Sequence, residues 1–199
     1  KFNAETATYK VADLDHKGGP ELIIGAADLS ADEAEQNTAI IQVLTILNQK
    51  GEWERIGKIE YQELLHGVPE VKELADIDGG GQEEIIMSLM YGGAASWTEG
   101  IINVDFAKKT MQWVHIRNEE GQLQDAIFIL AASAAHANVF HIEDADTDGK
   151  KELVEIFAQT LFDQTECEVF SYEWDNTVFA FDQSLSEQLL QSLGADCAM

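Results

Sequence analysis

The sequence of 199 residues predicts an all-β protein built from three repeated units of about four antiparallel strands, with a short helix near its end. Three observations predict this fold. An acidic motif recurs at near-equal spacing, and short runs rich in β-branched and aromatic residues follow each copy. Only one late apolar segment combines a helical period with start and stop signals.

The recurring motif reads DLDHKGGPE at 13–21, DIDGGGQEE at 76–84 and DADTDGKKE at 144–152; we call these segments the first, second and third acidic loops. Each copy has aspartate at its first and third positions, glycine at its sixth and glutamate at its ninth. The copies begin 63 (76 − 13) and 68 (144 − 76) residues apart. Three copies in phase indicate a repeated structural unit.

Strand-like runs flank every loop. The runs after the loops begin with ELIIGAADL, EEIIMSLMY and KELVEIFAQTLF, and two more follow each of these. They divide the chain into units of approximately 1–62, 63–124 and 125–183. A small sheet cannot bury both of its faces, so neighbouring units must pack together. Four-stranded sheets repeated at this period are typical of propeller blades, and we expect one propeller-like domain over residues 1–199.

Two segments fit the strand pattern poorly. The alanine-rich stretch at 125–137 predicts a helix inserted between the second and third units. The stretch at 184–194 predicts a C-terminal helix, because Ser184 and Glu187 have capping-box spacing and Gly194 can end it. Four leucines share one face of that helix, which we expect to pack on the last sheet: Leu185, Leu189, Leu190 and Leu193.

The Asp-x-Asp-x-Asp-Gly-x-x-Asp/Glu loop ahead of a strand resembles the FG-GAP/VCBS repeat of integrin α-subunit propellers and many bacterial secreted proteins. The resemblance implies a β-propeller with calcium in its blade loops. It also implies an extracytoplasmic protein that is secreted, periplasmic or surface-anchored, for example as a lipoprotein, with its signal segment outside this chain. Three blades are few for a propeller, which predicts further blades in a longer chain, a small or open ring, or self-association.

The third loop has a complete set of oxygen ligands for Ca²⁺. The expected ligands are Asp144, Asp146, Asp148, the Lys150 carbonyl and Glu152. The alternative is an EF-hand, in which the twelfth position would also be a ligand. We disfavour it because the flanks alternate as strands do, and because the twelfth position is Ile24 in the first loop and Met87 in the second.

The other two loops depart from this set. In the first loop Lys17 replaces the third acid, and its ammonium can neutralise Asp13 and Asp15, so we expect no tight site with Glu21 there. The second loop retains three carboxylates, and whether they bind metal is left open: Asp76, Asp78 and Glu84. For all three loops the alternative is a turn in which Asp side chains accept backbone N–H groups.

Charge bounds the partners of the chain. Its formal net charge of −25 disfavours nucleic acid and anionic membranes, and no apolar run approaches the length of a membrane span. Cys167 and Cys197 match no zinc or redox motif, and either form a disulfide or remain separate thiols. No histidine, serine or glycine pattern indicates an enzyme.

The sequence therefore favours a non-catalytic, calcium-stabilised module that binds a protein or glycan. The alternative is a hydrolase or lyase acting on polysaccharide in a groove across the blade ends. Tyr91 and Trp97 lie at the two ends of the glycine-containing stretch YGGAASW, and are candidates for an exposed ligand platform. The other three tryptophans lie within strand runs, where we expect packing: Trp53, Trp113 and Trp174.

Overall fold

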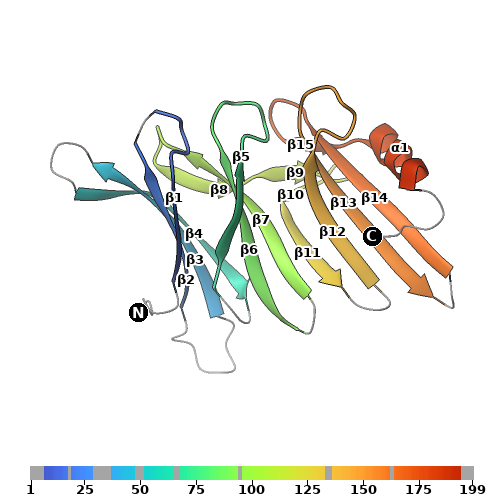
Figure 1. Ribbon diagram of the computed structural model, residues 1–199, viewed down its shortest axis with the longest axis horizontal. Helices are drawn as coiled ribbons and strands as arrows, with labels where there is room; N and C mark the ends of the chain where they lie inside the picture. Colours follow the sequence, from blue (N-terminus) through green and yellow to red (C-terminus); the bar gives the residue numbers. More distant parts are fainter. Residues whose placement is uncertain are drawn as a thin grey trace. The chain divides into compact units, whose positions relative to one another are not determined.

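The computed structural model describes residues 7–17, 19–28, 37–47, 52–64, 68–93, 96–132, 136–161 and 164–193. These residues form fifteen strands and one helix, which confirms the all-β class (Figure 1). Contacts divide the chain into two compact units, of which the first comprises residues 1–76 and 80–113 and the second 77–79 and 114–199. No described helix is both long enough and apolar enough to cross a membrane.

The first unit begins with a four-stranded antiparallel sheet in the order β1-β2-β3-β4. Its strands are β1 (Thr8–Ala12), β2 (Glu21–Asp28), β3 (Asn37–Leu47) and β4 (Glu52–Leu64). Isoleucine, leucine and valine are frequent in β2 and β3, which suits strands that pair on both sides. The first acidic loop connects β1 to β2.

A second antiparallel run in this unit has the order β5-β6-β7-β8. Its strands are β5 (Glu70–Ala75), β6 (Glu84–Gly93), β7 (Ser96–Asp105) and β8 (Thr110–Trp113). The second acidic loop connects β5 to β6 in the same way. The core of this run is isoleucine-rich, and Ile85, Ile101 and Ile102 are fully buried.

The two sheets of the first unit pack on each other, since β1 contacts β5 and β4 contacts β8. Two close approaches depend on glycine: a Cβ on Gly57 would collide with Met111, and one on Gly100 would collide with the ring of Trp113. Trp113 also meets Tyr61 edge to face at 6.0 Å and is buried, as the sequence predicts. The same expectation was wrong for Trp53, which is 48% exposed.

The second unit contains a seven-stranded sheet in the order β10-β9-β15-β14-β13-β12-β11. The chain-consecutive run β12 to β15 is antiparallel throughout, and the third acidic loop connects its first two strands, β12 and β13. The pairing of β15 with β9 is parallel. The strands are β9 (His115–Arg117), β10 (Leu123–Asp125), β11 (Ile127–Ala132), β12 (His136–Glu143), β13 (Glu152–Leu161), β14 (Gln164–Trp174) and β15 (Phe179–Phe181).

The predicted helix at 125–137 was wrong, because the described residues there belong mainly to β11 and the start of β12, while residues 133–135 lie outside the described part of the chain. Burial there alternates with the period of a strand: Phe128 and Leu130 are 3% and 1% exposed, whereas Ile129 between them is 61% exposed. Pairing with β12 and stacking of Phe128 on Phe140, with centroids 4.1 Å apart, override the helix propensity of the alanines.

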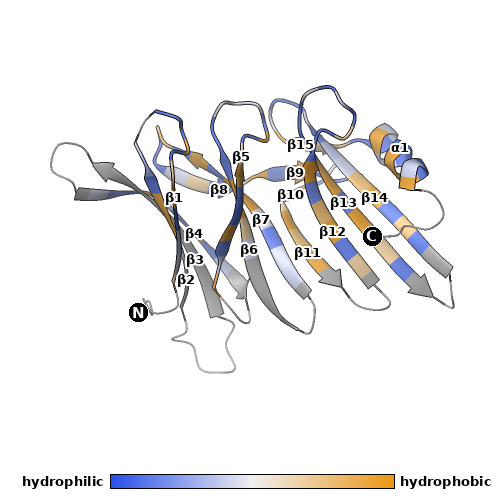
Figure 2. Cartoon of the chain, in the orientation of Figure 1, coloured by the Kyte–Doolittle hydropathy of each residue, from blue (hydrophilic) through white to orange (hydrophobic). Residues whose placement is uncertain are grey.

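The C-terminal helix is confirmed as α1 (Gln183–Leu193), which packs against β14 (Figure 1). Its N-cap is Asp182 rather than the predicted Ser184, since the Leu185 N–H donates to Asp182 Oδ1 at 2.9 Å. Hydrophobic and hydrophilic residues alternate along the coloured parts of β12, β13 and β14 (Figure 2). Of the predicted leucine face, Leu185 is buried while Leu190 is 36% exposed.

Each acidic loop thus lies between the first two strands of a run of four consecutive antiparallel strands. This is the order of strands that the sequence predicts. The division into three units at 1–62, 63–124 and 125–183, and their arrangement as propeller blades, stay predictions.

Three acidic loops as candidate metal sites

The three acidic loops share an unusual backbone conformation. The fourth residue of each has a positive φ: 53° at His16, 71° at Gly79 and 66° at Thr147. The sixth residue repeats it where the structure describes that position, with 80° at Gly81 and 92° at Gly149. Two left-handed residues in six turn the chain tightly enough to direct the preceding side chains inward.

Aspartate side chains hold this backbone from within the loop. The first aspartate accepts the N–H of the sixth residue, with Gly81 N 2.9 Å from Asp76 Oδ2 and Gly149 N 3.1 Å from Asp144 Oδ2. In the third loop Asp146 Oδ1 likewise accepts the N–H of Asp148 at 2.9 Å. These are the backbone-binding turns that we considered as an alternative to metal binding. They engage one oxygen of each carboxylate, so the turn does not exclude a metal.

The ninth residue of each loop is a buried glutamate at the start of the next strand. Glu21, Glu84 and Glu152 are 3%, 1% and 1% exposed. Glu152 Oε2 accepts the N–H of Ala145 at 2.7 Å, and Glu21 Oε2 accepts the N–H of Leu14 at 2.8 Å. A glutamate is rarely buried without a compensating charge or ion.

In each loop the first, third and ninth residues converge. Each offers a carboxylate oxygen, and within a loop these oxygens lie within 4.8 Å of one another. All nine residues are among the candidates from the sequence, although the third predicted set also contained Asp148 and the Lys150 carbonyl and no tight site was expected in the first loop: Asp13, Asp15 and Glu21; Asp76, Asp78 and Glu84; Asp144, Asp146 and Glu152. All donors are oxygens, which suits hard cations such as Ca²⁺ or Mg²⁺ better than zinc.

Glu152 tests whether the third group fits a cation. Its Oε1 atom is buried and has no hydrogen-bond partner among the described residues. Burial raises the pKa of this carboxyl, and the nearby charges of Asp146, Asp148 and Asp144 raise the pKa further. A cation between these groups would give Oε1 a partner and offset their mutual repulsion. The residues present therefore fit a metal ion.

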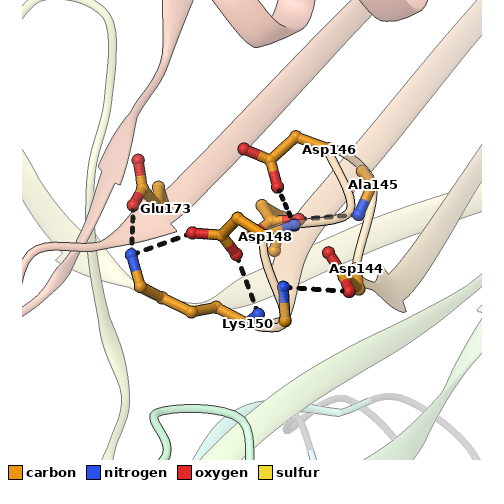
Figure 3. A network of polar contacts seen from close by, with 8 residues as sticks. Asp144, Ala145, Asp146, Asp148, Lys150 and Glu173 are labelled. Carbon is orange, nitrogen blue, oxygen red and sulfur yellow. Dashed lines mark hydrogen bonds and ion pairs between the residues drawn. The ribbon is translucent and has the colours of Figure 1, made fainter.

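Asp148, the fifth residue of the third loop, lies outside the converging group. Its carboxylate is 2.8 Å from the backbone N–H of Lys150 and 3.2 Å from Lys150 Nζ, which also reaches Glu173 at 2.8 Å (Figure 3). These contacts lower the pKa of Asp148 and raise that of Lys150. Whether the Lys150 carbonyl is a ligand stays a prediction.

The first loop has the predicted lysine contact. Lys17 Nζ is 3.2 Å from Asp15 Oδ2, and its side chain is 77% exposed. The lysine therefore contacts the edge of the carboxylate group instead of filling it, because Asp13, Asp15 and Glu21 still converge. This loop is also tied to the second by a backbone bond from Glu83 N to Leu14 O at 2.9 Å.

The strand–loop–strand context of the third loop excludes an EF-hand, which needs two flanking helices. Sequence reasoning found the converging residues but missed the left-handed fourth position. Among the three loops, only Gly79 indicates a left-handed residue from its type, because His16 and Thr147 are not residue types that predict this conformation.

The proposed aromatic platform is described only in part. Trp97 is half-buried, and its Nε1 donates to Glu99 Oε1 at 3.2 Å. Glu99 also pairs with Lys72 at 2.7 Å, so this indole belongs to a polar cluster on β5 and β7. The side chain of Tyr91 lies outside the described residues. Cys167 is disulfide-bonded, while Cys197 also lies outside them.

The chain matches no family model, and it has no match among curated proteins or solved structures. Its function must therefore be argued from its own geometry.

Proposed function

We propose that the chain is a non-catalytic, extracytoplasmic binding module whose acidic loops bind Ca²⁺. The observation that carries the proposal is the buried glutamate at the ninth position, held beside two aspartates in all three loops. Glu152 is 1% exposed and its Oε1 has no hydrogen-bond partner among the described residues, an arrangement that is costly unless a cation occupies the group.

Calcium is the cation that this donor set favours. The carboxylates come from an irregular loop and from the start of a strand, a flexible arrangement that Ca²⁺ accepts with six to eight oxygens at roughly 2.3–2.6 Å. Mg²⁺ demands a tighter octahedron and sheds water reluctantly. In the third loop Asp144, Asp146 and Glu152 would hold the ion, with water or main-chain oxygens completing its shell.

Two further features support the wider proposal. The disulfide at Cys167 is typical of an oxidising compartment, in agreement with an extracytoplasmic location. Each loop lies between the first two strands of a run of four antiparallel strands, and the motif resembles that of the FG-GAP/VCBS repeat. We propose that these runs are blades, which further blades or a second copy of the chain complete into a ring.

A thermal melt with chelator and then with millimolar Ca²⁺ tests the proposal. For a Kd near 10⁻⁴ M, binding to the folded state stabilises it by roughly 1.4 kcal/mol per site. In a protein of this size that raises Tm by roughly 3–6 °C per site. Mg²⁺ at the same concentration should raise it less. Identical melts with and without Ca²⁺ would show that the loops are turns only.

Glu152→Gln is the matched variant for the third loop. Glutamine keeps an oxygen that can accept the Ala145 N–H but removes the negative charge. The part of the calcium-dependent rise in Tm that comes from the third loop should therefore disappear. Glu173→Gln is the control, because it removes one negative charge from the neighbouring strand β14 without touching the converging group. Its calcium shift should equal that of the wild type.

A further inference from the structure

A groove of about 370 Å³ lies on the second unit, and its described lining includes none of the residues of the acidic loops. Neighbouring strands of one sheet contribute its main side chains: Ile129 from β11, Asn138 from β12, Phe157 from β13, and Glu166 and Glu168 from β14. Figure 1 shows these four strands side by side. Asn138, Phe157 and Glu168 lie directly opposite one another across the sheet.

The groove exposes two large apolar side chains. Ile129 is 61% exposed and Phe157 is 38% exposed, although both lie in the interior of strands. The ring of Phe157 is held edge to face against Phe170, with centroids 5.9 Å apart. A fixed aromatic ring beside an exposed isoleucine provides a surface for the apolar part of a ligand.

Asn138 supplies a buried polar group to the same groove. It is 5% exposed, and its Nδ2 donates to the Ile129 carbonyl at 2.6 Å and to Glu155 Oε1 at 3.1 Å. Both neighbours are acceptors, so the amide orientation is determined and Oδ1 is the atom that remains. Oδ1 is buried and has no hydrogen-bond partner among the described residues. A ligand group that donates a hydrogen bond to Oδ1 would therefore satisfy this atom.

The charge around the groove has one sign. Of the described residues that line it, Glu166 and Glu168 are acidic and exposed, and none is basic. Glu155, which holds the amide of Asn138, adds a third carboxyl, whose pKa is raised by burial. The whole chain carries a formal net charge of −25, so its field attracts cations over a longer range.

We propose that this groove binds an arginine side chain of a basic polypeptide partner. A guanidinium has five N–H donors, enough for Asn138 Oδ1 and for the carboxylates of Glu166 and Glu168 together. Its flat, weakly hydrated faces stack on an aromatic ring such as Phe157, and its methylene stem covers Ile129. The ammonium of lysine is more compact and more strongly hydrated, so it fits the apolar part less well. This inference specifies the ligand of the binding module proposed above and rests on that function.

The test uses short blocked peptides and the intact, isotope-labelled chain. Acetyl-Gly-Arg-Gly-amide is titrated in millimolar Ca²⁺ while the side-chain amide resonances of Asn138 are followed by NMR. The comparison peptide has citrulline in place of arginine, which keeps the shape and removes the charge. We expect saturable shifts at Asn138 with arginine, binding at least tenfold weaker with citrulline, and an intermediate affinity with lysine.

Glu168→Gln is the groove variant and Glu143→Gln its control. Both remove one charge from an exposed strand position of the same unit, but Glu143 lies at the far end of β12, five residues from Asn138. We expect Glu168→Gln to lower the affinity for the arginine peptide about fivefold, and Glu143→Gln to lower it less than twofold. Equal melting temperatures for the two variants will show that both are folded.

Three results would overturn the inference: no saturable shift with arginine, equal binding of the citrulline peptide, or tighter binding of a neutral apolar peptide. The same samples separate this failure from that of the proposed function. If the calcium-dependent rise in Tm remains while arginine does not bind, the assigned ligand is wrong and the module stands. If the rise in Tm is also absent, the proposed function fails as well.

Discussion

The first and third acidic loops share a left-handed fourth residue but are held in place differently. In the first loop the second residue is Leu14, which is fully buried, and the loop is bonded to its neighbour through Glu83. In the third loop the second residue is Ala145, which is half-buried, and Lys150 ties the loop to Glu173 from outside. The first loop is thus anchored by the core and the third by surface charges.

This difference teaches which positions of the motif determine a metal site. By sequence the fifth position separates the loops, being Lys17 in one and Asp148 in the other. In the structure both of these side chains lie outside the converging group, which contains the first, third and ninth residues in each case. The ninth residue is the buried one. We therefore propose that the buried glutamate is the main determinant of metal binding and that the fifth position modulates it.

The largest expected effect tests the difference in anchoring. Leu14→Ala removes a fully buried side chain and should destabilise the protein by about 3 kcal/mol, or lower Tm by roughly 6–12 °C. Ala145→Gly at the matched position should cost less than about 1 kcal/mol. Both are measured by thermal and denaturant unfolding in chelator. Equal losses would refute the idea that the core anchors only the first loop.

The next prediction concerns the fifth position. Asp146→Asn removes a member of the converging group and should weaken calcium binding by the third loop at least tenfold. Asp148→Asn removes a carboxylate that contacts Lys150, and should weaken calcium binding by the third loop no more than about threefold. Calorimetric titration of each variant gives the dissociation constants. If the two variants lose affinity equally, Asp148 is a ligand, as the sequence alone suggests.

These residues also show how far the sequence could predict the molecule. The converging carboxylates occupy fixed positions of a repeated motif, and strand-like runs flank each copy. Asp144, Asp146 and Glu152 could therefore be predicted from the sequence. The direction of the Asp148 carboxylate was not, because it depends on Glu173, which is distant in sequence and draws Lys150 toward β14. The groove at Asn138 could not be predicted for the same reason: its lining residues come from four strands and belong to no sequence motif.

The third prediction concerns backbone strain. Thr147 is β-branched and has a φ of 66°, a region that such residues rarely occupy. Thr147→Gly should therefore stabilise the protein by about 1 kcal/mol, raising Tm by roughly 2–4 °C. Histidine tolerates positive φ better than threonine does, so His16→Gly should increase stability by about half as much. A loss of stability in Thr147→Gly would mean that the threonine side chain contributes more than its strain costs.

The smallest effect separates the two lysines. Lys17 contacts Asp15, a member of the converging group, whereas Lys150 contacts Asp148 and Glu173, which are not members. A positive charge beside a carboxylate ligand opposes the cation that the carboxylate would bind, but Lys17 is 77% exposed and its effect is screened by solvent and salt. Lys17→Met should therefore strengthen calcium binding by the first loop about threefold at low salt. The gain should shrink at high ionic strength.

Lys150→Met should change the calcium affinity of the third loop by less than twofold. If Lys150→Met has the larger effect, binding of the ion must turn Asp148 away from the lysine and into the group, and the fifth position would then be a ligand after all.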